Sequence, residues 1–296
     1  LEQACFVGPT HVSSNNLPGG ITFARFQLER IQNGSFTNSI LVCDEISFLS
    51  CEQWRDLVKL AFGQNQFVLC GDFEQFKPVH STWAGSVVTK SAQFSDGFRD
   101  LAGGNMLVLT QNHRSEPTLF NFISNMPCQL SAAVKEARQR FPRKAGEVQH
   151  NLVLSHKKRI EINAKMNVAR HDSLFVKAPP PEPRLANHPQ DMHIYLGLEL
   201  IGCCSKKGIL HNGGRYTIKE IGEKVLLTCE SGEISLTPPE LVRDLRLSHA
   251  ITYHSSQGIT LKGRIRLWDA DHPRFTRRHL YVGISRATNA ALVEVA

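Results

Sequence analysis

The stretch ILVCDEISFLS, residues 40–50, decides how this chain is interpreted. Its first four residues are apolar, and two adjacent acids, Asp44 and Glu45, follow them directly. A buried strand of a parallel sheet delivers carboxylates to the sheet edge in this way, where they can serve the magnesium ion of a nucleotide. A solvated strand end that carries two acids is the plainer alternative. The pattern predicts a parallel strand that ends at Cys43 and leaves the role of its acids open.

The residues around this strand have the order strand, helix, strand that is typical of a parallel sheet. The segment SCEQWRDLVKLAFG predicts an amphipathic helix over residues 50–63, in which Ser50 and Gln53 form a capping box. ACFVG, residues 4–8, and FVLC, residues 67–70, predict two further buried strands. We therefore expect an α/β fold.

Polar side chains also follow the strand predicted at residues 67–70. Gly71 and Asp72 come directly after it, which on its own fits an ordinary turn, and Gln75 stands three residues further on. An amide at this place can sense the γ-phosphate of a nucleotide. Ligands of open α/β sheets bind at the carboxyl edge of the strands, so two adjacent strands with polar ends point to a ligand site.

The remainder of the chain predicts further elements and a change of texture. Apolar runs predict strands at residues 106–110 and 148–156, and a helix is expected over residues 158–169. Five prolines in residues 178–190 predict an extended linker. Short strands separated by Gly turns fill residues 192–247, which indicates a small β-barrel or sheet.

Composition narrows the class of protein. The net charge of +7 suits a polyanionic partner without proving one. No run of 18 apolar residues and no signal-peptide pattern occurs, so no membrane partner is expected. Eight cysteines without any C-x-x-C spacing argue against a zinc site and favour an intracellular, reducing compartment. Cys43 and Cys70 are expected to act as small apolar residues inside strands.

Several stretches have the chemistry to bind phosphate. Arg114 and Arg286 are each most simply a surface charge or a salt-bridge partner, but a guanidinium can donate two parallel hydrogen bonds to a phosphate. We expect Arg286 to project from a short helix. SHKKR, residues 155–159, fits a solvated charge cluster or a phosphate-backbone contact. ITYHSSQGIT, residues 251–260, fits a polar turn or a set of contacts to nucleic-acid phosphates.

Together and in this order, these segments resemble the motifs of a superfamily 1 helicase, most closely the RecD-like and petite-integration-frequency group of DNA helicases. FVGPTHVSSNNLPGGIT is similar to motif Ia, LVCDEIS to motif II and FVLCGDFEQFKPV to motif III. LTQNHRS resembles motif IV, AITYHSSQGIT resembles motif V and LYVGISRAT resembles motif VI. The resemblance covers nearly the whole chain.

The resemblance implies an α/β fold of two RecA-like P-loop NTPase domains, the first incomplete, with a small β-barrel insert in the second. The first domain would comprise residues 1–105, and the second residues 106–191 and 248–296. The insert, residues 192–247, looks like a Src-homology-3-like barrel. The implied activity is that of an ATP-dependent DNA helicase or single-stranded DNA translocase with 5′→3′ direction.

The resemblance also implies roles at the matching positions. Asp44 would hold Mg²⁺, and Glu45 would be the catalytic carboxylate. The ATP site would further include Gln75, Arg114, Gly258 and Arg286. Single-stranded or forked DNA would lie along Thr10, Asn15, Thr252, His254 and Ser256.

The chain departs from the family pattern in three ways. No segment matches the phosphate loop G-x-x-x-x-G-K-[ST], which in this family precedes motif Ia, and the chain has no initiating Met. We therefore expect a fragment that has lost this loop and hydrolyses ATP weakly or not at all. Ser255 stands where many relatives have Lys, which removes a phosphate contact. Gly283 replaces a common Ala and is expected only to loosen its helix.

Two alternatives stay open. Viral-type superfamily 1 RNA helicases share motifs II, III and VI, so RNA is an alternative partner. A degenerate helicase retained as a nucleic-acid-binding module would account for the missing phosphate loop. The sequence does not specify protein partners or a pathway among replication, repair and recombination.

Overall fold

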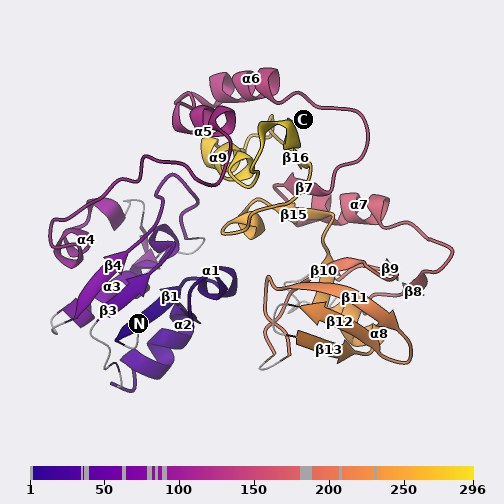
Figure 1. The fold of residues 1–296 in the computed structure, drawn as a ribbon, viewed down its shortest axis with the longest axis horizontal. Coiled ribbons are helices and arrows are strands. Elements are labelled where there is room, and N and C mark those ends of the chain that lie inside the picture. The colour runs from indigo at the N-terminus through magenta and orange to yellow at the C-terminus, as the bar shows by residue number, and fades with distance from the viewer. Residues whose placement is uncertain are drawn as a thin grey trace. The chain divides into compact units, whose positions relative to one another are not determined.

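The computed structural model describes residues 3–34, 36, 40–61, 65–78, 82–83, 86–88, 92–180, 189–206, 209–229 and 232–296. The chain divides into two compact units (Figure 1). The first unit comprises Leu1–His113 with Gln257–Ile259, and the second comprises Arg114–Ser256 with Thr260–Ala296. No helix in the described ranges is long and apolar enough to cross a membrane.

The first unit is built on a four-stranded sheet in which every pair of neighbours is parallel. Its order is β2-β1-β3-β4, with strands β1 Ala4–Gly8, β2 Ile21–Thr22, β3 Ile40–Cys43 and β4 Gln66–Leu69. The helices are α1 His11–Asn15, α2 Phe23–Phe26, α3 Cys51–Ala61 and α4 Asp96–Leu101, and a π-helical turn, Gln27–Ile31, extends α2. A short hairpin joins β5 Thr82–Trp83 to β6 Ser86–Val87. The strands expected around residues 4–8, 40–43 and 67–70 are thereby confirmed.

Helix α3 forms as its sequence predicts. The Gln53 side-chain oxygen accepts from the Ser50 amide at 2.9 Å, and the Gln53 amide donates to Ser50 Oγ at 3.3 Å, which closes the expected capping box. Trp54 and Leu57 are buried on its inner face and pack in one apolar cluster with residues of the sheet such as Leu41. Fully burying such a side chain contributes about 1.5–3 kcal/mol, so this face anchors the helix to the strands.

Two expectations for the first unit were wrong. Residues 106–110 form no strand, and Leu107 and Leu109 are 94% and 91% exposed. A strand needs a neighbouring strand to satisfy its backbone groups, and no strand among the described residues pairs with this segment. Cys43 is buried in β3, as expected, but Cys70 lies beyond the end of β4 and is exposed.

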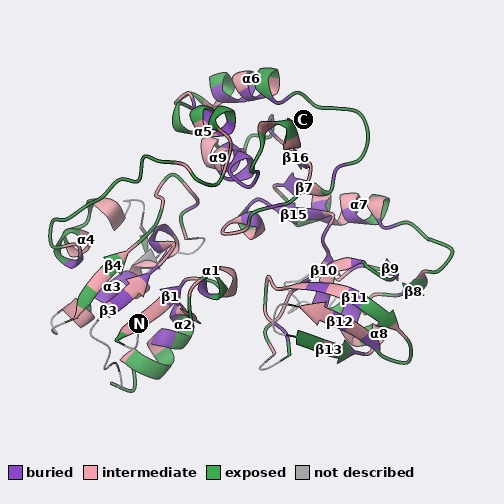
Figure 2. Ribbon diagram, viewed as in Figure 1, coloured by how far each residue is buried: buried purple, intermediate pink, exposed green. Residues whose placement is uncertain are grey.

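The second unit contains a four-stranded parallel sheet. Its order is β15-β7-β16-β17, with strands β7 His150–Val153, β15 Ala250–Thr252, β16 Ile265–Leu267 and β17 Val293–Val295. The helices of this part are α5 Pro117–Ser124, α6 Leu130–Arg140, α7 His156–Met166 and α9 Arg277–Ile284. Strands β7 and β15 are almost entirely buried (Figure 2). The apolar residues of these strands, Leu152 and Val153 in β7 and Ala250 and Ile251 in β15, are buried, as is typical of a parallel sheet covered on both faces.

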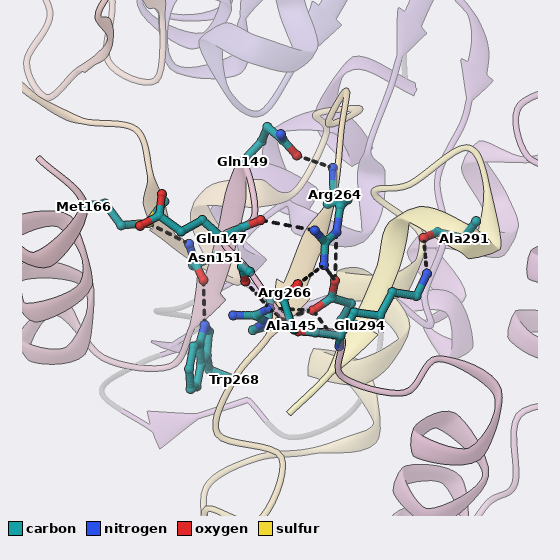
Figure 3. Close-up of polar contacts among 12 residues, drawn as sticks. Ala145, Glu147, Gln149, Asn151, Met166, Arg264, Arg266, Trp268, Ala291 and Glu294 are labelled. Atoms are coloured by element: carbon teal, nitrogen blue, oxygen red, sulfur yellow. Dashed lines mark hydrogen bonds and ion pairs between the residues drawn. The ribbon is translucent and has the colours of Figure 1, made fainter.

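A buried ionic network connects β16 to β17 (Figure 3). The Glu294 side chain is fully buried, and its two oxygens accept from Nε of Arg264 and Nε of Arg266, each at 2.9 Å. Burial acts to raise the pKa of Glu294, but the hydrogen bonds from both arginines outweigh it and leave the pKa below its ordinary value. Removing one partner of a buried pair costs about 3–5 kcal/mol, so this network holds the sheet together.

The β-rich segment of the second unit is an antiparallel sheet of five strands. Its order is β13-β12-β11-β10-β14, with strands β10 Glu199–Gly202, β11 Arg215–Ile221, β12 Val225–Cys229, β13 Gly232–Leu236 and β14 Leu245–Leu247. In the sequence, helix α8, Pro238–Asp244, follows β13 and precedes β14. Strands β8 Leu174–Val176 and β9 Met192–Ile194 form a separate antiparallel pair. The described strands form an open order, so closure of this sheet into a barrel stays a prediction.

Candidate functional site

The polar ends of three strands lie at one edge of the first sheet. The Asp44 amide donates to the Val7 carbonyl at 2.9 Å, which aligns the end of β3 with the end of β1. The Cys70 amide donates to the Cys43 carbonyl at 2.8 Å, and the Ile46 amide donates to the Cys70 carbonyl at 3.0 Å. The residues that follow β1, β3 and β4 are thereby brought together at the carboxyl edge, as the sequence predicts for a ligand site.

Glu45 has a backbone conformation that is uncommon for a side-chain-bearing residue. Its φ of 50° and ψ of 41° are left-handed, and a short 3₁₀ turn, Ile46–Phe48, follows it. This conformation costs about 1–2 kcal/mol outside glycine. Gly71 makes the turn possible, because a Cβ there would lie 2.6 Å from Ile46 Cγ1 and 2.9 Å from the Ile46 amide nitrogen. The absence of a side chain at Gly71, after β4, therefore allows the backbone turn that places Glu45 after β3.

Asp72 organises the loop that carries Gln75. Its Oδ1 accepts from the Glu74 amide at 2.9 Å, and its carbonyl accepts from the Gln75 amide at 3.2 Å. The Gln75 side-chain amide donates to Asp72 Oδ2 at 3.3 Å. Gln75 is thus held next to the edge where Asp44 and Glu45 lie, and it is partly buried.

Thr10 and Asn15 mark the two ends of helix α1, directly after β1. Thr10 is exposed, and its Oγ1 accepts from the Ser13 amide at 3.1 Å while its own amide donates to Ser13 Oγ at 3.0 Å. Asn15 is exposed in the last turn. Both expected contacts for a nucleic-acid strand are accessible, although the Thr10 hydroxyl also serves as a helix cap.

In the second unit, β15 ends in a loop that we call the motif V loop, residues 252–256. The Thr252 hydroxyl lies 2.8 Å from Ser255 Oγ and accepts from the Ser255 amide at 3.3 Å. Ser256 is fully buried, and its hydroxyl donates to the Tyr253 carbonyl at 2.8 Å. Thr252 is also buried. Both hydroxyls hold the loop in place, so a nucleic-acid strand along Thr252 and Ser256 stays a prediction. His254 is exposed.

The sequence offered no signal for the histidine that lies beside His254. His279, in helix α9, is buried, and its ring centroid lies 5.8 Å from that of His254. Its Nδ1 accepts from the Thr276 amide at 3.0 Å, which requires an unprotonated Nδ1. Burial, with a smaller effect of His254, lowers the pKa of His279 to about 4. His279 is therefore neutral at physiological pH and supports the exposed ring of His254.

Arg114 and Arg286, far apart in sequence, meet at Ser285. Nη2 of Arg114 donates to the Ser285 carbonyl at 3.0 Å, and Nη2 of Arg286 donates to the Ser285 hydroxyl at 2.8 Å. Arg114 is exposed, but Arg286 is only 1% exposed and also donates to the carbonyls of Val282 and Ser256. The expected projection of Arg286 is wrong, because α9 ends at Ile284 and the side chain folds back onto its last turn.

Two glycines, Gly258 after the motif V loop and Gly283 in helix α9, occupy positions that suit a residue without a side chain. Gly258 has a φ of +77°, in the left-handed region, and belongs to the first unit. Gly283 lies in α9, where a Cβ would be 2.4 Å from Leu267 Cδ2 and 2.9 Å from Tyr253 Cε1. The expectation that Gly283 only loosens its helix is wrong, since the close approach of α9 to β16 requires the missing side chain.

No family model matches the sequence, and no curated protein matches it. Solved structures do match. The Pif1 helicase from Candida albicans aligns with a TM-score of 0.68 and 20% identity over 99% of this chain and 83% of that one. This chain has the fold of the Pif1 helicases. Bacteroides Pif1 bound to ssDNA aligns with a TM-score of 0.66 and 18% identity, over 99% of this chain and 82% of that chain.

Another similar structure contains both ADP-AlF3 and ssDNA. Pif1 helicase from Bacteroides in complex with ADP-AlF3 and ssDNA aligns with a TM-score of 0.63 and 20% identity, over 99% of this chain and 82% of that one. The Pif1-like fold identifies the two parallel sheets described above as those of RecA-like domains. No group of three His, Cys, Asp or Glu side chains in the described ranges could hold a metal ion. Magnesium that arrives with a nucleotide needs only one or two carboxylates, and the edge at Asp44 offers these.

Proposed function

We propose that this protein is an ATP-dependent DNA helicase or single-stranded DNA translocase that moves 5′→3′. The observation that carries the proposal is the meeting of Asp44, Glu45 and the Gln75 loop at one sheet edge in a chain with the Pif1-like fold. The direction comes from the sequence resemblance alone. Two of the similar structures contain Bacteroides Pif1 bound to ssDNA, which supports single-stranded DNA as the partner.

Each residue of the edge has a proposed task in ATP hydrolysis. Asp44 holds Mg²⁺, which would neutralise charge on the phosphates during the reaction. Glu45 orients the attacking water and accepts its proton, and Gln75 contacts the γ-phosphate. In the second unit, Arg114 is the exposed cation suited to the phosphates. Arg286 acts on the same site through Ser285, which both arginines contact.

Strand binding is proposed for exposed residues of both units. Thr10 and Asn15 in the first unit and His254 in the second contact the phosphate backbone of the strand. Thr252 and Ser256 support these contacts by holding the motif V loop, and Gly258 gives the chain its left-handed turn after it. Differences in grip between nucleotide states would advance the strand during each cycle.

A nucleic-acid-binding module without ATPase activity is the second candidate, and one observation favours it. The 296 residues contain no phosphate loop, whose Lys and amides would cradle the β- and γ-phosphates. We therefore expect the chain as given to hydrolyse ATP little. Brisk turnover by this chain in an ATPase assay would contradict that expectation.

The coding sequence upstream of Leu1 separates the two candidates. An in-frame strand followed by a phosphate loop would support the motor, and a stop codon or unrelated sequence would favour the binding module. If the phosphate loop is present upstream, Glu45→Gln in the protein that includes it should reduce DNA-stimulated turnover at least about 100-fold and leave ATP binding intact, because only the water loses its base. Near-normal turnover in that variant would reject the assigned role of Glu45.

Substrate and direction need separate assays. We expect ATPase activity of a chain that includes the phosphate loop to be stimulated more by single-stranded DNA than by RNA of the same sequence. Stronger stimulation by RNA would favour the RNA-helicase alternative. Duplexes with either a 5′ or a 3′ single-stranded tail test the direction, since a 5′→3′ motor separates only the 5′-tailed substrate.

A further inference from the structure

Arg246, in strand β14, lies beside the motif V loop. Its Nη2 donates to Ser255 Oγ at 3.4 Å, a long contact that leaves most of its donors for other groups. Its Nε is buried and has no hydrogen-bond partner among the described residues. Buried donors in proteins are almost always satisfied, so the unpartnered Nε means that part of the hydrogen-bonding capacity of this guanidinium is unused.

Other arginines of the second unit do have carboxylate partners. Arg243, three residues earlier, pairs with Asp244 at 2.9 Å. Arg264 and Arg266 share Glu294. Arg246 forms no ion pair with any carboxylate of the described residues, although it is half-buried. A charge that has left water without a counter-ion is unfavourable, and an incoming anion would offset this cost.

A second buried cation lies near Arg246. Arg159, in the first turn of α7, is fully buried. Burial and the neighbouring Arg246 guanidinium lower the pKa of Arg159 to about 10. Burial is the larger cause, and repulsion between the two guanidinium groups adds to it. A phosphate near Arg246 would relieve this repulsion and would give the arginine a strong, charge-assisted hydrogen bond.

The motif V loop supplies the remaining donors and lacks a charge of its own. Ser255 is half-exposed, its hydroxyl lies 2.8 Å from that of Thr252, and His254 is exposed. The stretch AITYHSSQG, residues 250–258, contains no Lys or Arg. Guanidinium and hydroxyl groups together are the set that nucleic-acid-binding proteins direct at phosphate oxygens.

We propose that Arg246 binds a backbone phosphate of the nucleic-acid strand at Ser255 and supplies the positive charge that the motif V loop lacks. The inference rests on the proposed function, because it assumes that a strand passes this loop. It adds a contact from the β-rich sheet, outside the residues that the helicase motifs identify.

The test is the salt dependence of binding to a fluorescein-labelled oligo(dT), measured by anisotropy on the full 296-residue chain. Each phosphate contact on a single strand contributes about 0.7 to the slope of log K against log salt. Arg246→Gln should therefore lower the slope by about 0.7. Arg243→Gln removes the same charge from an existing ion pair and should leave the slope unchanged. Ser255→Lys added to Arg246→Gln should restore it.

Ser255→Asp tests the proposed role of Arg246 in phosphate binding while Arg246 itself stays in strand β14. Its carboxylate would pair with the guanidinium, so binding should weaken as in Arg246→Gln. An unchanged slope in Arg246→Gln, an equal loss in Arg243→Gln, or a double variant that stays weak would overturn the assignment. A wild-type chain that does not bind oligo(dT) at about 50 mM salt would instead refute nucleic-acid binding itself.

Discussion

Replacing Gly283 by Ala tests whether helix propensity or close packing governs helix α9. An exposed helical Gly→Ala change stabilises a protein by about 1 kcal/mol. Here the added Cβ would lie 2.4 Å from Leu267 Cδ2 and 2.9 Å from Tyr253 Cε1. Both neighbours are fully buried, so neither can move cheaply. Overpacking costs about 1–3 kcal/mol, and a contact as short as 2.4 Å belongs to the upper part of this range. After subtraction of the gain in helix propensity, we expect Gly283→Ala to lower the free energy of unfolding by about 1–2 kcal/mol.

Urea unfolding followed by Trp268 fluorescence measures this change in the second unit. The indole of Trp268 donates to Asn151 at 2.8 Å, so it reports on the same sheet. Replacing Trp54 and Trp83 by Phe in all variants removes the other two tryptophans. Gly222→Ala is the control, because a Cβ there would meet only a carbonyl at 3.7 Å.

A double-mutant cycle identifies the cause. Leu267→Ala alone should cost about 2–5 kcal/mol, because it leaves a cavity in the core. In that background Gly283→Ala should cost at least about 1 kcal/mol less than in the wild type, since its closest neighbour is gone. A Gly283→Ala variant as stable as the wild type would show that propensity prevails and would refute the packing argument.

Two other predictions concern the first sheet edge and pH. Gly71→Ala should lower the stability of the first unit by about 1–3 kcal/mol, measured by Trp54 fluorescence in urea, because its Cβ would lie 2.6 Å from Ile46; an unchanged midpoint would contradict this. His279 has a pKa of about 4 in the folded chain against 6.5 in the unfolded chain, so its contribution to stability is complete above pH 6.5 and is lost as the pH falls toward 4. The expected loss at pH 5 is about 2 kcal/mol. His279→Gln keeps the capping geometry and should remove this part of the pH dependence; an equal dependence in that variant would reject it.

The sequence predicted those parts of the fold that depend on local pattern. The apolar run before Asp44, and the capping box of Ser50 and Gln53, identify β3 and α3 because periodicity and caps act within a few residues. The prediction of a strand over residues 106–110 was wrong because a strand also needs the edge of another strand to pair with, and a local apolar run does not reveal whether one is present. The prediction that Cys70 lies inside a strand as a small apolar residue was wrong for a similar reason, since burial depends on which distant residues cover the end of the strand.

The candidate site residues differ in the same way: some positions follow from local pattern and strand topology, and others depend on contacts between distant parts of the chain. Motif order placed Asp44 and Gln75 at a common edge because parallel strands make that edge a consequence of topology. The orientation of Arg286 was not predictable, because it is set by Ser285, Val282 and Ser256, whose groups converge only in the folded chain. A buried arginine that ties a helix end to the motif V loop can still transmit a change at Ser285 to the exposed Arg114. Because both arginines contact Ser285, we expect loss of either guanidinium to disturb the position of the other.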